Sequence, residues 1–291
     1  MIQQTQPIHL LNQVLAEVEA GHATEALMML SGMLDASVAR GQGLNSWRAS
    51  LTGHPLSRLL NAHLTLPVDT SNLDSACITE RPVSRFSPLS GATKMMADSF
   101  SRMGFVRALD ARQSLSRQCV AEAWSIGKQV ALFDCANLGA LDELAGRDMQ
   151  NIVSVSGAQT GTDFCNTSGS HSFAIHAVGA NSGQQFDLIL ASTIADRLRK
   201  AELISACKHF AAKLKPSGRI ILSAFAPGHL GVGLQQLCLN PDLVCHSEQA
   251  LEDVAAAADL SITSFRDASN SLIWAELRSN SEIRKSKGDT A

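Results

Sequence analysis

The stretch that decides the fold is Phe186–Gly228, which begins "FDLILAS" and ends "FAAKLKPSGRIILSAFAPG". Residues 186–192 form an apolar run of strand length, and residues 196–214, "DRLRKAELISACKHFAAKL", have the composition and length of a helix. "LKPSG" then predicts a turn into a second apolar run, residues 218–225. Two buried strands joined through a helix predict a parallel pair in a sheet that is covered by helices.

The same alternation extends through the C-terminal two thirds of the chain. The strand-like runs are residues 129–134, 151–156, 172–178, 186–192, 218–225, 260–267 and 271–278, and a further helix-like stretch is 248–260. The first five runs are predicted to be parallel strands. Only "ASN" separates the last two runs, which is too short for a helical crossover, so they predict an antiparallel hairpin. The predicted class is therefore α/β, with a Rossmann-like seven-stranded sheet that ends in this hairpin.

The N-terminal part of the chain has helical periodicity and lacks the alternation of strands with helices. Residues 7–40 carry apolar side chains at helical spacing and predict two helices that are separated at Gly21. Residues 41–92 are irregular, with a short helix after Pro55, and residues 92–126 are helical again. Arg107, Arg112 and Arg117 on that last helix are interpreted as a solvated face rather than an anion site. The predicted domains are a helical region over 1–92 that serves as a lid or as a substrate or partner region, a sheet domain over 93–279 and a polar tail over 280–291.

Composition excludes several classes of function. The net charge of −3 offers no basic surface for nucleic acid, and no run approaches the roughly 18 apolar residues of a membrane span. The N-terminus lacks the basic region of a signal peptide, so a cytoplasmic location is expected. Seven cysteines without a CxxC pair predict reduced thiols, and we expect no metal site. Because the chain has no tyrosine, no mechanism can use a phenol.

Three segments together resemble a known family. "VALFDCANLG" (130–139) precedes "FDLIL" by about 55 residues, and "LKPSGR" and "FAPG" follow it, as in class I S-adenosylmethionine-dependent methyltransferases. The resemblance covers roughly residues 95–278, and the sheet with its final hairpin is the one that this family implies. One subfamily fits more closely than the others, the bacterial 3-hydroxy fatty acid methyl ester synthase type. Its pattern is matched at Cys135, Leu138, Asp187, Asp196, Leu214, Pro216, Gly218, Arg219 and Phe225–Gly228.

The resemblance implies a site for S-adenosylmethionine where the strands end. Ligands of open α/β sheets bind beyond the carboxyl ends of the strands, at the point where the strand order reverses. The expected cofactor-binding residues are Asp134, Cys135, Ala136, Asn137, Gly139, Ser156, Ala191 and Ser192. For Asp134, a helix N-cap is an equally good interpretation, and for Cys135 core packing is the better one. Asp196 and His229 are weak catalytic candidates, because each follows a strand at its carboxyl end.

Departures from the family pattern leave the function open. Ala136 occupies the place of a close-approach glycine, and the second strand ends in Ser156 where the family has an acidic residue for the ribose hydroxyls. One hypothesis is methyl transfer to an oxygen, carboxylate or hydroxyl, of a small molecule. The alternative is a non-catalytic methyltransferase fold that serves as a scaffold or partner subunit, and a repurposed pocket is a third reading. The expected partner is accordingly a small-molecule substrate or a partner enzyme, and homo- and hetero-oligomers both stay open.

Overall fold

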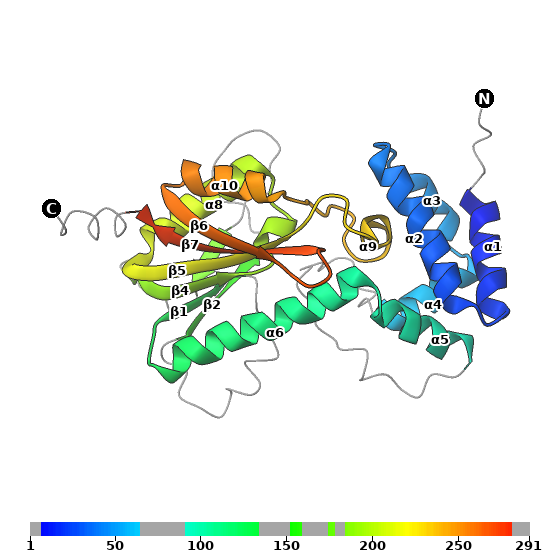
Figure 1. Ribbon diagram of the computed structural model, residues 1–291, viewed down its shortest axis with the longest axis horizontal. Coiled ribbons are helices and arrows are strands. Elements are labelled where there is room, and N and C mark those ends of the chain that lie inside the picture. Colours follow the sequence, from blue (N-terminus) through cyan, green and yellow to red (C-terminus); the bar gives the residue numbers. More distant parts are fainter. Residues whose placement is uncertain (1–6, 65–90, 134–151, 159–173, 178–183, 281–291) are drawn as a thin grey trace. The chain divides into compact units, whose positions relative to one another are not determined.

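The computed structural model describes residues 7–64, 91–133, 152–158, 174–177 and 184–280 (Figure 1), with 61–64, 152–158 and 174–177 described by their backbone. The chain divides into two compact units. Unit 1 comprises residues 1–110, 228–243 and 268–271, and unit 2 comprises residues 111–227, 244–267 and 272–291. This division differs from the boundary expected at residue 92, because it assigns two later segments of the chain to the N-terminal unit.

Unit 1 is helical. It contains α1 (Pro7–Glu19), α2 (Ala23–Ala39), α3 (Asn45–Leu51), α4 (Pro55–Leu64), α5 (Ala92–Ser101), the beginning of α6 (Gly104–Ser125) and α9 (Val232–Cys238). The two helices predicted over residues 7–40 are confirmed, and Gly21 between them has a φ of 91° that suits glycine. Leu11, Val14, Leu27 and Leu30 are fully buried or nearly so, which makes the contact of α1 with α2 the core of this unit.

The later segment 228–243 belongs to unit 1 because α9 packs on α2. The Asp35 carboxylate of α2 accepts hydrogen bonds from the backbone N–H groups of Gly231 (2.8 Å) and Gly233 (2.7 Å), at the N-terminus of α9. A Cβ at Gly233 would lie 2.5 Å from the Leu34 carbonyl carbon, so the two helices approach each other through a glycine. This contact joins residues almost 200 positions apart, which explains why a boundary drawn along the sequence missed it.

Unit 2 is built on one sheet. Its strands are β1 (Val130–Phe133), β2 (Ile152–Ala158), β3 (Ala174–Ala177), β4 (Phe186–Ala191), β5 (Leu214–Phe225), β6 (Leu260–Arg266) and β7 (Leu272–Ser279). Their order is β3-β2-β1-β4-β5-β7-β6. β2, β1, β4 and β5 are parallel, whereas β7 is antiparallel to both β5 and β6. The α/β class is therefore confirmed, with helices and a predominantly parallel central sheet.

The direction of β3 corrects one expectation. β3 pairs antiparallel with β2, with Ser156 opposite His176, so it is not one of the five parallel strands that the alternation predicted. A parallel connection needs a crossover of a dozen or more residues that is usually helical. The connecting residues 159–173 are rich in Ser, Thr and Gly and have no helical periodicity. The absence of a helix-forming pattern there was the available signal for an antiparallel strand.

The "LKPSG" segment corrects a second expectation, that of a turn before the strand. The structure assigns it to the beginning of β5 rather than to a turn before the strand, and the pairing of β4 with β5 shifts register there, from Phe186 opposite Leu214 to Leu188 opposite Arg219. A Cβ at Gly218 would lie 2.7 Å from the Phe186 carbonyl oxygen. The strand can therefore pass close to β4 at this irregularity only because residue 218 is glycine.

Helices cover both faces of the sheet. α8 (Lys200–Ala212) and α10 (Glu248–Ala257) lie on one face, and α6 lies on the other (Figure 1). Alternate residues of β5 serve the two faces: Ile220, Leu222 and Ala224 join the core cluster under α8 and α10, whereas Arg219 and Ile221 face α6. No helix among the described residues is long and apolar enough to cross a bilayer.

Candidate functional site

The strand order identifies the edge of the sheet where a ligand is expected. β1 has β2 on one side and β4 on the other, so the chain leaves the centre of the sheet in opposite directions from β1. The carboxyl ends of these two parallel strands are Phe133 in β1 and Ala191 in β4. In open α/β sheets this reversal point is the usual ligand position.

Five of the predicted cofactor residues belong to the loop that follows β1. Asp134, Cys135, Ala136, Asn137 and Gly139 lie outside the described residues, so the contacts expected of them stay predictions. Ser156 lies within β2 rather than at its end, because the strand continues to Ala158. Its backbone is opposite His176 of β3.

Two predicted cofactor residues are described at the carboxyl end of β4. Ala191 is fully buried in the core cluster under α8 and α10, and Ser192 is 1% exposed. The Ser192 carbonyl oxygen accepts a hydrogen bond of 2.6 Å from the Ser223 hydroxyl of β5. Both residues are small and buried, so neither presents a bulky side chain at this strand end.

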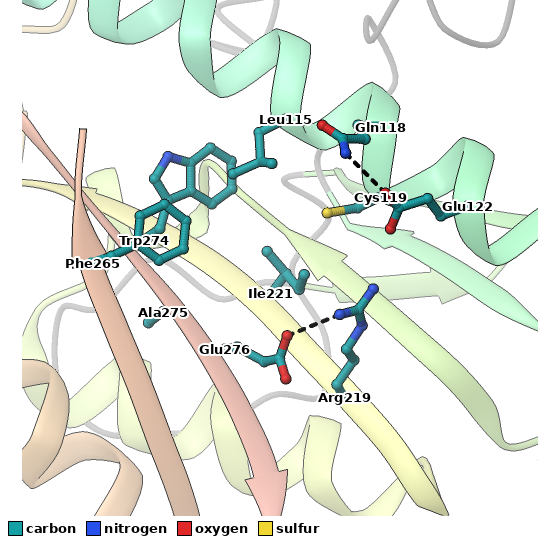
Figure 2. Close-up of a pocket in the computed structure, with 10 residues that line it drawn as sticks. All are labelled: Leu115, Gln118, Cys119, Glu122, Arg219, Ile221, Phe265, Trp274, Ala275 and Glu276. Carbon is teal, nitrogen blue, oxygen red and sulfur yellow. Dashed lines mark hydrogen bonds and ion pairs between the residues drawn. The ribbon is translucent and has the colours of Figure 1, made fainter. Parts of the chain in front are cut away.

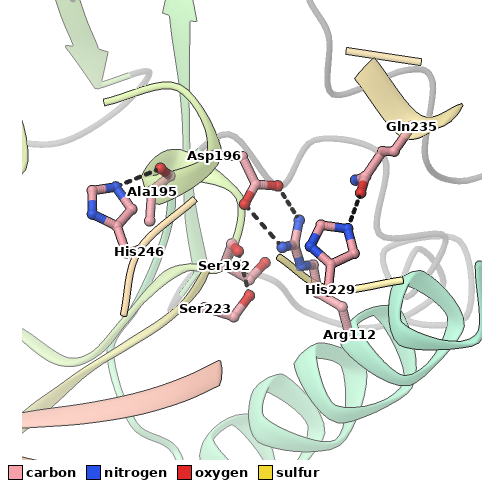
Figure 3. Close-up of polar contacts among 8 residues, drawn as sticks. All are labelled: Arg112, Ser192, Ala195, Asp196, Ser223, His229, Gln235 and His246. Carbon is pink, nitrogen blue, oxygen red and sulfur yellow. Dashed lines mark hydrogen bonds and ion pairs between the residues drawn. The ribbon is translucent and has the colours of Figure 1, made fainter. Parts of the chain in front are cut away.

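Asp196 forms a buried ion pair. It ends the short 3₁₀ helix η4 (Ile194–Asp196), which follows β4. The Arg112 guanidinium of α6 donates to both carboxylate oxygens, with Nη1–Oδ2 at 2.6 Å and Nη2–Oδ1 at 3.1 Å (Figure 3). The side chains of Arg112 and Asp196 are only 4% and 10% exposed. Because both oxygens of Asp196 are engaged by a cation, this carboxylate is not available as a general base.

Arg112 contradicts the interpretation of its helix face as solvated. Its guanidinium lies 4.8 Å from the centre of the Phe225 ring, at the carboxyl end of β5, in the geometry of a cation–π contact. Only Arg107 of the three arginines is exposed. Arg112 belongs to a buried stripe with Ser116, Val120 and Ala123, at spacings of three and four. That spacing was visible in the sequence and could have identified the buried arginine.

The segment that carries Asp196 is anchored by a second chain segment. The backbone N–H of Val244 donates to the Asp196 carbonyl oxygen at 2.9 Å. The His246 ring nitrogen Nε2 lies 3.1 Å from the Ala195 carbonyl oxygen (Figure 3) and 2.9 Å from that of Leu198. Since carbonyl oxygens only accept, Nε2 carries the proton. Sequence reasoning missed His246, which has no neighbouring motif to identify it.

His229, the second catalytic candidate, belongs to unit 1. It is buried, and its Nε2 lies 2.8 Å from the Gln235 side-chain oxygen Oε1 (Figure 3). An amide oxygen only accepts, so this contact places a proton on Nε2. His229, which directly follows "FAPG", therefore donates a hydrogen bond to Gln235 of α9.

Asp187 has a structural role at the start of β4. At the amino end of β4, its Oδ2 accepts hydrogen bonds from the Gln129 backbone N–H (2.9 Å) and from Lys215 Nζ (2.7 Å). Burial would raise the pKa of Asp187, but the contacts with Lys215 and Gln129 hold it below its ordinary value. Among the described residues, no group of three or more His, Cys, Asp or Glu side chains could hold a metal ion.

Comparison with known proteins gives distant structural likenesses. No protein-family model and no curated protein matches the sequence. Among solved structures, a possible exported protein from Bordetella parapertussis is 13% identical, with 89% of this chain and 96% of that chain covered and a TM-score of 0.46. Magnesium protoporphyrin IX methyltransferase from Synechocystis, solved with bound SAH, is 12% identical, with 72% and 96% covered and a TM-score of 0.41. A methyltransferase from Streptomyces caelestis is 13% identical, with 56% and 89% covered and a TM-score of 0.36. TM-scores below 0.5 mark all three as distant likenesses.

Proposed function

We propose that unit 2 is a methyltransferase-type domain that binds S-adenosylmethionine at the carboxyl ends of β1 and β4 and supports methyl transfer to an oxygen of a small molecule. The observation that carries this proposal is the strand order β3-β2-β1-β4-β5-β7-β6, with β7 antiparallel between β5 and β6. The sequence resemblance to class I methyltransferases implies this order, and the matched residues Asp187 and Gly218 occupy structural positions along β4 and β5 that fit it.

The described end of β4 is compatible with the cofactor. Ala191 and Ser192 are small and buried, so neither places a bulky side chain beyond the strand. The loop residues Asp134, Asn137 and Gly139 are proposed to complete the binding site, with Asp134 in place of the acidic residue that Ser156 does not supply. Bound S-adenosylmethionine would supply an electrophilic methyl group on a sulfonium.

The partners of Asp196 and His229, the two catalytic candidates, restrict the class of molecule that can accept the methyl group. Asp196 is paired with Arg112, and His229 Nε2 is bonded to Gln235, so neither the Asp196 carboxylate nor the Nε2 atom of His229 is a free base. A hydroxyl acceptor requires proton removal, whereas a carboxylate is already ionised at neutral pH. The protein then has only to position the acceptor and exclude water. We therefore propose a small carboxylic acid as the substrate class.

The buried ion pair of Arg112 and Asp196 also favours a second candidate function, a non-catalytic scaffold or partner subunit. If the buried pair of Arg112 and Asp196 is a purely structural element and the loop after β1 no longer grips a cofactor, unit 2 keeps the fold without the chemistry. Ser156 and Ala136, which replace the family's acidic residue and glycine, point in this direction.

A transfer assay separates the two functions. The full chain is incubated with methyl-labelled S-adenosylmethionine and a panel of carboxylic acids and alcohols of matched carbon skeleton. We expect label in esters of the acids, and loss of that label in Asp134→Ala. Asp253→Asn removes an exposed carboxylate on α10 and should leave transfer unchanged. Absence of label in every acceptor would support the scaffold, and transfer to alcohols alone would contradict the proposed substrate class.

A further inference from the structure

Unit 2 contains a cavity that is separate from the carboxyl ends of the strands. It has a volume of about 200 Å³ and lies between α6 and the face of the sheet (Figure 2). The sheet contributes Arg219 and Ile221 of β5, Phe265 of β6 and Trp274 and Glu276 of β7, and the helix contributes Leu115, Gln118, Cys119 and Glu122. The two β5 residues that line the cavity, Arg219 and Ile221, lie several residues before the carboxyl end of the strand at Phe225. The cavity therefore opens on the face of the sheet and not at the ends of its strands.

One end of the cavity is aromatic. The rings of Phe265 and Trp274 stack nearly parallel, with centroids 6.4 Å apart and planes 13° from each other. Leu115 lies next to Trp274, and Ile221 lies on the floor between the two ends (Figure 2). Phe265 lies on the edge strand of the sheet and is 52% exposed. An aromatic side chain held half in water at a cavity mouth offers apolar surface that a ligand would cover.

The opposite end is polar and close to electrically balanced. Glu276 accepts hydrogen bonds from Arg219 (2.9 Å) and Arg278 (2.7 Å), and Gln118 donates to Glu122 Oε1 at 2.9 Å. Burial would raise the pKa of Glu276, but Arg278 and Arg219 hold it below its ordinary value, so it is ionised at neutral pH. Glu122, Glu276 and the Arg219 guanidinium line this end, and the Arg278 guanidinium, which lies outside the lining, pairs with Glu276 and brings the net charge of the four groups close to zero.

The mixture of positive and negative charges at this end favours a ligand whose head group is uncharged. An anion would meet Arg219 but would also face Glu122 and Glu276, and a cation would meet the reverse combination. A hydroxyl or amide can accept from the Arg219 guanidinium and donate to the Glu122 carboxylate at the same time. The volume sets the size, because a dry cavity of about 150 Å³ already accepts benzene. We propose that this cavity binds a small uncharged molecule made of one aromatic ring and a short hydroxyl- or amide-bearing head, with the ring against Trp274.

The test compares three probes with the same ring. These are 2-phenylethanol, 2-phenylethylamine and phenylacetate, titrated into the full chain while the tryptophan indole N–H signals are followed by NMR. The chain has three tryptophans, and a Trp274→Phe variant assigns the signal of Trp274. We expect 2-phenylethanol to shift that signal saturably, and to bind about tenfold more tightly than either charged probe because each meets a like charge.

Two variants make the test specific. Leu115→Phe fills the aromatic end and should abolish the shift. Glu122→Gln removes an exposed carboxylate from the polar end and should tighten phenylacetate several-fold, whereas Glu252→Gln on α10, on the opposite face of the sheet, should change nothing. A flat titration at about 20 mM 2-phenylethanol would overturn the proposal, as would equal affinity for all three probes. So would a phenylacetate affinity that is the same in Glu122→Gln and Glu252→Gln.

Discussion

Replacement of Asp196 by alanine is expected to destabilise unit 2 strongly. The change leaves the Arg112 guanidinium in place, with a side chain that is 4% exposed and therefore out of reach of bulk water. Its remaining partner is the face of Phe225, which attracts a cation but does not accept its N–H groups as a carboxylate does. The variant thus creates an uncompensated buried charge, which is among the most destabilising single changes known in proteins.

The magnitude follows from the geometry of the pair. Two charge-assisted hydrogen bonds at 2.6 and 3.1 Å are lost, and such bonds contribute about 1.5–3 kcal/mol each. Removal of one partner of a buried pair typically costs about 3–5 kcal/mol, which agrees with that sum. For a unit of this size, a change of 1 kcal/mol lowers the melting temperature by about 2–4 °C, so a loss of about 10 °C is expected.

The chain contains a matched control for this experiment. Lys200 and Asp253 have the same N–O distance of 2.6 Å, but their side chains are 51% and 46% exposed. Exposed pairs are screened by water and contribute little, so Asp253→Ala should leave the melting temperature almost unchanged. In the double variant Arg112→Met/Asp196→Leu, both charges are gone, and much of the lost stability should return.

The assay is thermal and urea unfolding followed by circular dichroism, on the wild type and the three variants. Equal stability losses for Asp196→Ala and Asp253→Ala would refute the reasoning, because the two changes differ in burial and not in contact distance. A double variant as unstable as Asp196→Ala would show that the charge left behind is not the cause of the loss.

Three further predictions test other parts of the fold. Gly233→Ala should lower the free energy of unfolding, because its Cβ would lie 2.5 Å from the backbone of α2; urea unfolding measures this, and an unchanged midpoint contradicts the tight approach. Contacts with Lys215 hold the folded pKa of Asp187 below 3.8, so its stabilisation is present above that pH and is lost as pH falls through the lower folded value. Asp187→Asn should therefore flatten the acid limb of stability against pH, and an unaltered limb would rule this out. Burial raises the pKa of Cys207 to about 12, so iodoacetamide at pH 8 should label its peptide only after denaturation, as mass spectrometry can show.

The strands of the central sheet could be predicted because each is a short apolar run with a turn or helix signal beside it. "FDLILA" is buried along almost its whole length in the structure, as a central parallel strand requires. The antiparallel relation of β6 and β7 follows from the short connection between them. These are local properties of composition and spacing, and they are readable from one sequence.

Strand direction at β3 and the unit boundary depend on non-local contacts. β3 is antiparallel to β2, and the composition of residues 159–173 argued against a crossover helix but did not by itself specify that direction. The assignment of α9 to unit 1 rests on Asp35 and Gly233, which lie 198 positions apart. No period or motif in the sequence connects these two positions.

The position of Asp196 was predicted better than its role. Asp196 does follow β4 at its carboxyl end, as expected, but its partner Arg112 lies 84 positions away on a helix whose charged residues read as solvated. Burial of Arg112 follows from its place on an apolar stripe, whereas the identity of its partner requires the fold. A carboxylate that reads as a catalytic candidate can therefore be one half of a structural ion pair.

Calorimetric titration of the full chain with S-adenosylmethionine and S-adenosylhomocysteine tests the central claim most directly. The proposal predicts saturable binding of both, with a dissociation constant in the micromolar range, and clear weakening in Asp134→Ala but not in Asp253→Asn. Absence of heat up to about millimolar ligand would contradict a cofactor site at the ends of β1 and β4 and would leave unit 2 as a scaffold.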